Sequence, residues 1–248
     1  IDVRDHAIAG LGQVAEVGNS IVKAKLLSML SHSKESWSRI LVALSKVVQR
    51  GDVEALAAVQ NVVKSLESSH FALTTYAKLA EHMDETVISV LMSRAADPDA
   101  HVRTVVVLLI SSLAPHDDER VMPLLNSGAQ DRDIDVRIAT ANATARLARA
   151  GNQEAFVLLD SLKDDEEQRV KSATQKLIGY LQNTLAGDWS AKRALEHAFT
   201  KLWRRWSVDD SLSFLDELQD EAEDELHVLH RHRLVTGSRP RRNVKGGM

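Results

Sequence analysis

The sequence predicts an all-α protein: an α-solenoid in which pairs of helices stack into a right-handed superhelix, followed by a C-terminal cap helix and a basic tail. Three observations support this prediction. A pattern recurs every 33 or 34 residues, apolar residues follow helical spacing inside each copy, and the 248 residues include only 4 Pro and 11 Gly. Few Pro and Gly favour helices over a sheet with many tight turns.

The repeat is marked by a valine followed by a basic residue. The copies are Val3-Arg4, Val102-Arg103, Val136-Arg137 and Val170-Lys171. Positions 102, 136 and 170 are 34 residues apart, and the separation of 99 positions from 3 to 102 equals three intervals of 33. Internal repetition with a period of roughly 20–50 residues is typical of solenoids and similar arrays.

The valine of each copy lies at the start of a predicted amphipathic helix. Apolar or small residues lie 0, 3, 7 and 11 positions on, as in Val136, Ala139, Ala143 and Leu147. This spacing follows the 3.6-residue turn of a helix. Acids just before the valine are expected to cap the free N–H groups of the helix; those three residues before it are Asp99, Asp133 and Glu167. A polar break and a second apolar stretch, such as "AFVLLDSL", complete a helix–turn–helix unit.

Residues 36–63 and 70–96 fit the pattern less closely but also read as helix pairs. In the first of these stretches, Arg39 opens a pair and Asp52 is expected to cap its second helix. We expect five or six pairs up to about Leu185. The predicted organisation is a solenoid over residues 1–186, divergent helices that cap it over residues 187–235, and a flexible basic tail over residues 236–248.

Three segments at the start of the units carry a resemblance to a known family. They are "DPDAHVR" (97–103), "DRDIDVR" (131–137) and "DEEQRVK" (165–171). The chain resembles the HEAT-repeat family, particularly its short HEAT-like repeats of the PBS-lyase type, over about three quarters of its length. The resemblance implies an architecture but says little about activity, because such solenoids serve many unrelated roles.

The repeated charged residues are interpreted as a structural ladder of caps and ion pairs. They are Asp97, Arg103, Asp131, Arg137, Asp165 and Lys171. The alternative is a catalytic or ligand-binding array. Recurrence at a fixed period favours the structural interpretation, because a catalytic group is needed once and a stacking device is needed in every unit.

The sequence suggests no catalytic residues, no metal site and no cofactor. Some HEAT-like proteins are di-iron hydroxylases with repeated His-Glu pairs, but here the order is reversed, as Glu81-His82 and Glu196-His197. His227 and His230 could share a helix face, yet the chain has no Cys to complete a thiolate zinc site. We therefore expect a protein that is not an enzyme.

A tryptophan–arginine cluster marks the C-terminal region as a candidate binding site. Trp203, Arg204, Arg205 and Trp206 could stack on bases and bind phosphates. The favoured alternative is that the tryptophans close the end of the hydrophobic core and the arginines lie in water.

The last segment changes charge sharply. Residues 216–226 contain seven acids and no base, within a leucine stripe that predicts one long cap helix opening at Ser207. The basic tail that follows is expected to be flexible alone and could bind an anionic surface or nucleic acid. Its candidate binding residues are Arg239, Arg241, Arg242 and Lys245.

Together these features predict a non-enzymatic interaction scaffold that binds a protein partner through the solenoid surface or its C-terminal end. The alternative is a nucleic-acid-binding solenoid that uses the local basic patch, since the net charge of −4 excludes a generally cationic surface. No membrane span is expected, because the longest apolar run has six residues. We expect an intracellular, cytoplasmic protein, and one region of a larger protein or complex, because residue 1 falls inside a repeat.

Overall fold

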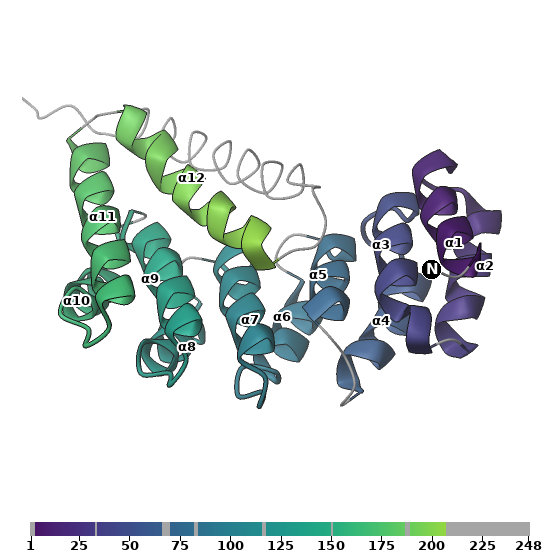
Figure 1. Ribbon diagram of the computed structural model, residues 1–248, viewed down its shortest axis with the longest axis horizontal. Helices are drawn as coiled ribbons and strands as arrows, with labels where there is room; N and C mark the ends of the chain where they lie inside the picture. Colours follow the sequence, from purple (N-terminus) through teal and green to yellow (C-terminus); the bar gives the residue numbers. More distant parts are fainter. Residues whose placement is uncertain are drawn as a thin grey trace, which may run out of the picture. The chain divides into compact units, whose positions relative to one another are not determined.

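A computed structural model shows the arrangement of the helices (Figure 1). It describes residues 3–32, 34–65, 70–81, 84–115, 118–149, 151–186 and 189–206. Every helix described below belongs to the first of two compact units, Ile1–Leu212, and the second unit, Ser213–Met248, lies outside the described residues. No residue in the described ranges forms a strand, so the predicted all-α fold is confirmed.

The helices alternate between two series. The odd-numbered helices are α1 (Val3–Val14), α3 (Trp37–Val47), α5 (His70–Leu79), α7 (Ala100–Leu113), α9 (Ile134–Arg149) and α11 (Gln168–Leu185). The even-numbered helices are α2 (Ser20–His32), α4 (Val53–Lys64), α6 (Glu85–Met92), α8 (Val121–Ala129), α10 (Gln153–Leu162) and α12 (Trp189–Trp206), and a short 3-10 helix, η1 (Lys34–Ser36), precedes α3.

The six odd-numbered helices pack side by side and are called the odd-helix layer below. Each contacts the next, from α1 and α3 to α9 and α11 (Figure 1). The even-numbered helices up to α10 pack against them, with α2 on α3, α4 on α5 and α6 on α7. Further along, α8 packs against both α7 and α9, and α10 packs against α8, α9 and α11.

Helix starts are fixed by the acids that the sequence pattern singles out. Asp52 accepts a hydrogen bond from the Ala55 N–H at 3.0 Å, and Asp99 accepts one from His101 at 2.9 Å. Asp133 accepts from the first turn of α9. These three predicted caps are confirmed. Glu167 was wrongly expected to cap α11: it stands at the N-cap position, but its side chain makes no capping hydrogen bond.

A glycine in the left-handed region ends the turn before three of the helices. Gly18, Gly51 and Gly151 have φ angles of 88°, 76° and 94°, a region that side chains other than glycine rarely adopt. The next residue then caps the following helix in each case. In the two Gly-Asn pairs, Gly18-Asn19 and Gly151-Asn152, the glycine thus forms the turn and the asparagine forms the cap.

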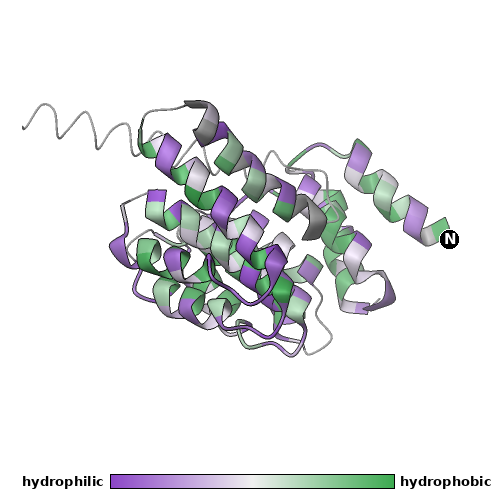
Figure 2. Ribbon diagram, turned by 60° about the vertical axis from the view of Figure 1, so that its left-hand side comes forward, coloured by the Kyte–Doolittle hydropathy of each residue, from purple (hydrophilic) through white to green (hydrophobic). Residues whose placement is uncertain are grey.

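The buried face of the helices follows the 34-residue pattern. In α9, the predicted core residues from Val136 to Leu147 are buried, and in Figure 2 hydrophobic and hydrophilic residues alternate around the helices. The apolar run from Val105 to Ile110 is fully buried inside α7. A strand-like apolar run becomes a helix here because its neighbours impose helical spacing.

The middle of α9 consists mainly of small residues and is buried on all sides. Every residue from Ala139 to Ala145 is buried, because α9 is packed against α7, α8, α10 and α11. Thr140 and Thr144 satisfy their hydroxyls within the helix by donating to carbonyls four residues earlier, at 2.9 and 2.7 Å. Alanine and threonine therefore let neighbouring helices approach without leaving buried hydroxyls unpaired.

Helix α12 departs from the alternation. It packs against α11, α9 and α7, and therefore lies on the odd-helix layer rather than among the even-numbered helices (Figure 1). The region predicted to cap the solenoid thus begins with a helix laid across its odd-helix layer. The long helix predicted to open at Ser207 lies outside the described residues.

Candidate functional site

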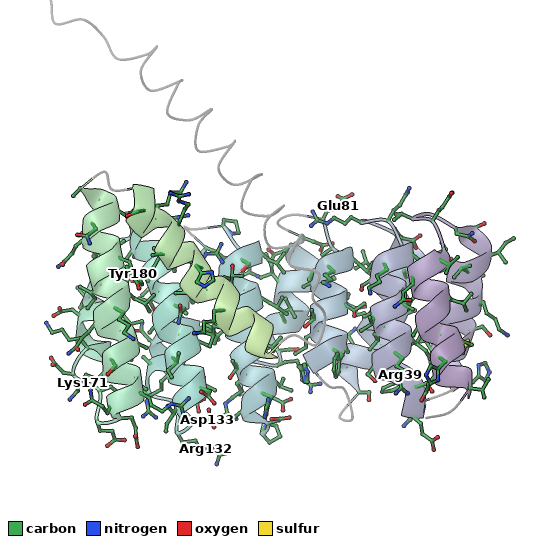
Figure 3. The ribbon with its side chains drawn as sticks, turned by 45° about the horizontal axis from the view of Figure 1, so that its top comes forward. Arg39, Glu81, Arg132, Asp133, Lys171 and Tyr180 are labelled. Atoms are coloured by element: carbon green, nitrogen blue, oxygen red, sulfur yellow. The ribbon has the colours of Figure 1, made fainter. Side chains whose placement is uncertain are left out.

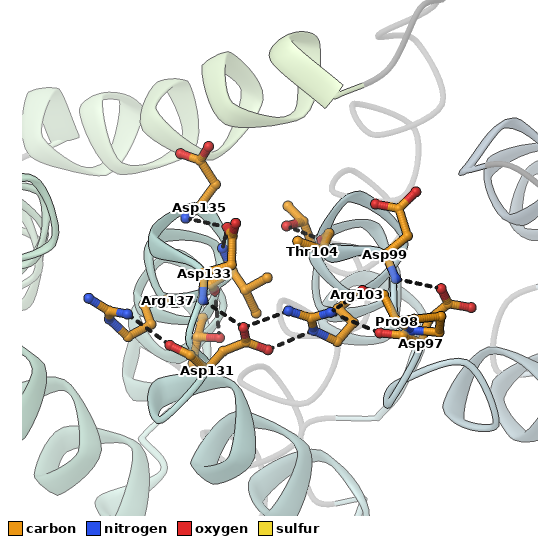
Figure 4. A network of polar contacts seen from close by, with 12 residues as sticks. Asp97, Pro98, Asp99, Arg103, Thr104, Asp131, Asp133, Asp135 and Arg137 are labelled. Atoms are coloured by element: carbon orange, nitrogen blue, oxygen red, sulfur yellow. Dashed lines mark hydrogen bonds and ion pairs between the residues drawn. The ribbon is translucent and has the colours of Figure 1, made fainter.

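The turns between units are joined by buried arginine–aspartate pairs. Arg103 holds Asp131 of the next unit with two hydrogen bonds, Nε to Oδ2 and Nη2 to Oδ1, both 2.7 Å (Figure 4). Arg137 holds Asp165 in the same way, at 2.9 and 3.1 Å. Four of the six residues predicted to form a ladder are therefore brought together, each arginine reaching forward by 28 residues.

Each of these arginines also holds the turn of its own unit. Arg103 donates through Nη1 to the carbonyl of Asp97 at 2.8 Å, and Arg137 donates to the carbonyl of Asp131 at 2.8 Å (Figure 4). A planar guanidinium has five donors in a fixed fork, so it can bind a carboxylate and a carbonyl together. One side chain thereby fixes two consecutive turns.

The carboxylate of Asp97 is bound by an arginine, Arg94, that the repeat pattern does not reveal. Arg94 donates to it through Nε at 2.9 Å, and through Nη1 to the carbonyl of Val63 at 2.7 Å. Asp97 also accepts the N–H of Asp99, two residues on, at 2.9 Å. The same contact to the residue two positions on recurs at Asp131 and Asp165.

The electrostatics of these pairs are those of structural links. Burial raises the pKa of Asp131, but hydrogen bonds from Arg103 and from the Asp133 N–H outweigh it and hold the pKa below its usual value. The same hydrogen bonds act on Arg103 in the opposite direction and raise its pKa above the usual value. The pair is therefore ionised at neutral pH, and its donors and acceptors are used in linking turns.

Lys171 is the member of the predicted ladder without the predicted link. Its side chain makes no hydrogen bond or ion pair with any described residue, and it lies at one end of the row (Figure 3). The residue 28 positions on is Phe199, which cannot accept a hydrogen bond in place of an aspartate. Figure 3 places Lys171 at the same edge of the row as Asp133.

A second set of ion pairs joins neighbouring helices on the surface. Arg39 pairs with Asp5, and Arg169 pairs with Asp135 at 3.0 Å; both pairs join residues 34 positions apart. Arg120 binds Asp118 at 2.6 Å and also Glu85. These pairs are more exposed than the turn links and so contribute less stability.

Helix α12 is anchored on the odd-helix layer by its apolar face. Leu195 and Phe199 are both only 2% exposed. The guanidinium of Arg146, on α9, lies 4.4 Å from the centroid of the Phe199 ring and donates to the Ser112 hydroxyl on α7 at 2.9 Å. One arginine therefore links α7, α9 and α12, through a hydrogen bond and a cation–π contact.

The opposite face of α12 is basic. Arg193, His197 and Lys201 are exposed at intervals of four residues, which places them along one row of the helix. The tryptophan–arginine cluster predicted from sequence, Trp203 to Trp206, forms the last turn of α12. Its side chains, and the predicted tail residues from Arg239 to Lys245, lie outside what the structure describes.

A histidine pair joins the starts of α5 and α7. The rings of His70 and His101 are stacked with centroids 6.4 Å apart. Burial, and then the charge of His101, lower the pKa of His70, while the charge of Asp99 raises it. His70 is the first residue of α5, where the positive end of the helix dipole also opposes protonation of its ring.

Sequence reasoning missed Arg94, Arg120, Arg146 and the histidine pair. Arg146 lies 34 residues after Ser112, so the period could have paired them. Arg94 and Arg120 lie in connecting segments that the repeat pattern does not align, and their roles depend on the folded turns. The histidines are 31 residues apart, outside the repeat interval.

The described residues offer neither a metal-binding cluster nor a membrane-spanning helix. No group of three or more His, Asp or Glu side chains there is placed to hold a metal ion. None of the described helices combines the length and the apolar character needed to cross a bilayer. No protein-family model matches the chain, and comparison with curated proteins finds no match.

Proposed function

We propose that the chain is a HEAT-like, right-handed α-solenoid that serves as a non-enzymatic interaction scaffold for a protein partner. The observation that carries the proposal is the docking of α12 on the odd-helix layer through Leu195 and Phe199. A layer that binds an amphipathic helix of its own chain has the shape and apolar character to bind one from another protein. The repeated charges support the same reading, since they are used in linking turns.

Among the described helices, α12 packs against α7, α9 and α11 of the odd-helix layer. The odd-helix layer continues beyond α7 to α3 and α1, where Arg39 and Lys46 are exposed on α3. We expect a protein partner to lie along this part of the layer. Affinity purification of the full chain, followed by mass spectrometry, should recover a stoichiometric protein partner.

A matched pair of variants assigns the binding to a surface. Lys46→Glu, on α3, is expected to weaken capture of the partner by roughly tenfold. Val53→Asp, an exposed position on α4, should leave it unchanged. If both variants capture the partner equally well, the odd-helix layer is not the binding surface. If the full chain recovers no stoichiometric protein partner, the scaffold proposal is refuted.

The basic row of α12 supports a second candidate function, the binding of nucleic acid. Residues 189–206 contain five Lys or Arg and a single acid. Binding to phosphates releases counterions, so affinity for a short labelled DNA or RNA should fall steeply as salt rises. Arg193→Glu combined with Lys201→Glu should abolish it. Weak binding of the unaltered chain even at low salt would rule this function out.

A further inference from the structure

Among the described residues, no even-numbered helix follows α11 in the way that α10 follows α9. After α11 the chain enters α12, which packs on the odd-helix layer instead. An open groove of about 410 Å³ lies between α10 and α11. Its lining includes Phe156, Val157 and Asp160 from α10, and Ile178, Leu181 and Gln182 from α11.

One repeat earlier, the corresponding place is filled. Thr144 and Ala148 of α9 lie 34 residues before Ile178 and Gln182, and α10 packs against α8 and α9 there. Thr144 and Ala148 are fully buried, whereas Ile178 is half-buried and Gln182 is exposed. The groove is therefore the place that the missing even-numbered helix would take.

Large apolar side chains in and near the groove are exposed to solvent. Val157, which lines the groove, is 72% exposed, and Leu185, four residues after the lining Leu181 on α11, is 58% exposed; both values are high for large apolar side chains in regular helices. A side chain added at Gly179 would meet no atom within 4 Å, while Ala145, 34 residues earlier, is completely buried. The exposed apolar side chains and the open space at Gly179 would allow another helix to approach α11 closely.

Lys171 supplies a charge for the same occupant. In the preceding unit, Arg137 binds Asp165, which lies three residues after the last residue of α10, Leu162. Lys171 occupies the position of Arg137 one repeat on, and has no side-chain partner among the described residues. A helix seated in the groove would bring an acid to Lys171 if its C-terminal turn resembled that of α10.

We propose that the α10–α11 groove binds a single amphipathic helix of a partner protein, followed by an acidic turn. The helix α10 defines its pattern: apolar residues at the spacing of Ala155, Leu158, Leu159 and Leu162, then an acid three residues on. The groove continues the series of positions in which even-numbered helices pack against odd-numbered ones. It is a different surface from the odd-helix layer and stands independently of the proposed function.

A peptide copy of α10 tests this directly. The probe is a labelled synthetic peptide of residues 151–168, which keeps the capping Asn152 and the turn with Asp165. It is titrated with the full chain and followed by fluorescence anisotropy. Isolated helices of this length are marginal in water, so the titration extends to about 1 mM. Saturable binding is expected.

Matched variants place the peptide in the groove. Val157→Asp puts a charge on the rim and should weaken binding by roughly tenfold. Val53→Asp is the control, since Val53 is also a highly exposed valine, 79% exposed, and is the first residue of α4, a helix that does not line the groove. It should change binding by less than about twofold. Circular dichroism of both variants checks that they fold.

The acidic turn has its own control. Lys171→Gln should weaken binding about threefold, and Asp165→Asn in the peptide should then cause no further loss. Three results would overturn the proposal: no saturable binding up to the limit of the titration, equal binding by Val157→Asp and the unaltered chain, or self-association of the chain that Val157→Asp abolishes. The last result would show that a second copy fills the groove.

Discussion

Removal of one turn link should destabilise the protein far more than removal of a surface pair. In Arg103→Met, the bidentate contact to Asp131 and the hydrogen bonds to the carbonyls of Asp97 and Pro98 are lost together. The side chains of Arg103 and Asp131 are only 9% and 13% exposed, so Asp131 would be left as a nearly buried, unpaired carboxylate. Breaking a buried pair in this way costs about 3–5 kcal/mol.

Arg169→Met is the matched control for this prediction. Arg169 pairs with Asp135 across neighbouring odd helices in a single ion pair, but its side chain is 55% exposed. An exposed pair contributes about 0–1 kcal/mol, so the urea midpoint of Arg169→Met should lie close to that of the unaltered protein. The midpoints are measured by circular dichroism at neutral pH.

The double variant Arg103→Met, Asp131→Leu separates the charge from the shape of the link. Replacing both partners with apolar residues removes the unpaired carboxylate, so it should recover much of the stability lost by Arg103→Met alone. Equal losses for Arg103→Met and Arg169→Met would refute the reasoning. So would a double variant less stable than Arg103→Met, because the cost could not then come from an unpaired charge.

Two further predictions concern close packing and pH. Gly12→Ala should lower the free energy of unfolding by about 1–3 kcal/mol, because the new Cβ would lie 2.9 Å from the Ala43 Cα. In Gly10→Ala the new Cβ would meet no atom within 4 Å, so the free energy of unfolding should rise by up to about 1 kcal/mol. Thermal melting compares the two variants. Burial and the charge of His101 hold the pKa of His70 below that of the unfolded chain, so the unfolded state takes up this proton first as pH falls through about 6.5 and stability is lost there. His70→Gln should reduce the shift of the urea midpoint between pH 7.5 and 5.5, and an unchanged shift would contradict this cause.

The parts of the fold that the sequence predicted are those that recur. The helices and the caps at Asp52, Asp99 and Asp133 could be read because the same local chemistry appears in each copy. Glu167 shows the limit of this reasoning. It stands at the capping position of α11, but Asp165 takes the N–H of Glu167 and the Glu167 side chain makes no capping hydrogen bond.

Four of the six ladder residues were predictable as members, but their connections were not. Spacing alone shows an aspartate followed six residues later by a basic residue, as at Asp97 and Arg103, and gives no reason to join Arg103 to Asp131 rather than to Asp97. The structure decides this, because the side chain of Arg103 reaches the carboxylate of the next unit and the carbonyl of Asp97 at the same time. Arg94 fills the remaining position at Asp97 from a turn that the repeat does not align.

The position of α12 was beyond sequence reasoning for a different physical reason. Amphipathic spacing shows that one face of residues 189–206 is apolar, but both the end of the row and the odd-helix layer offer apolar surface to cover. Val157 in the end groove is still exposed, whereas Leu195 and Phe199 of α12 are buried on the odd-helix layer. Arg146 lies under the Phe199 ring only in this arrangement, so a cation–π contact adds to apolar burial in favouring the layer. Because α12 packs on the odd-helix layer, it does not fill the groove between α10 and α11.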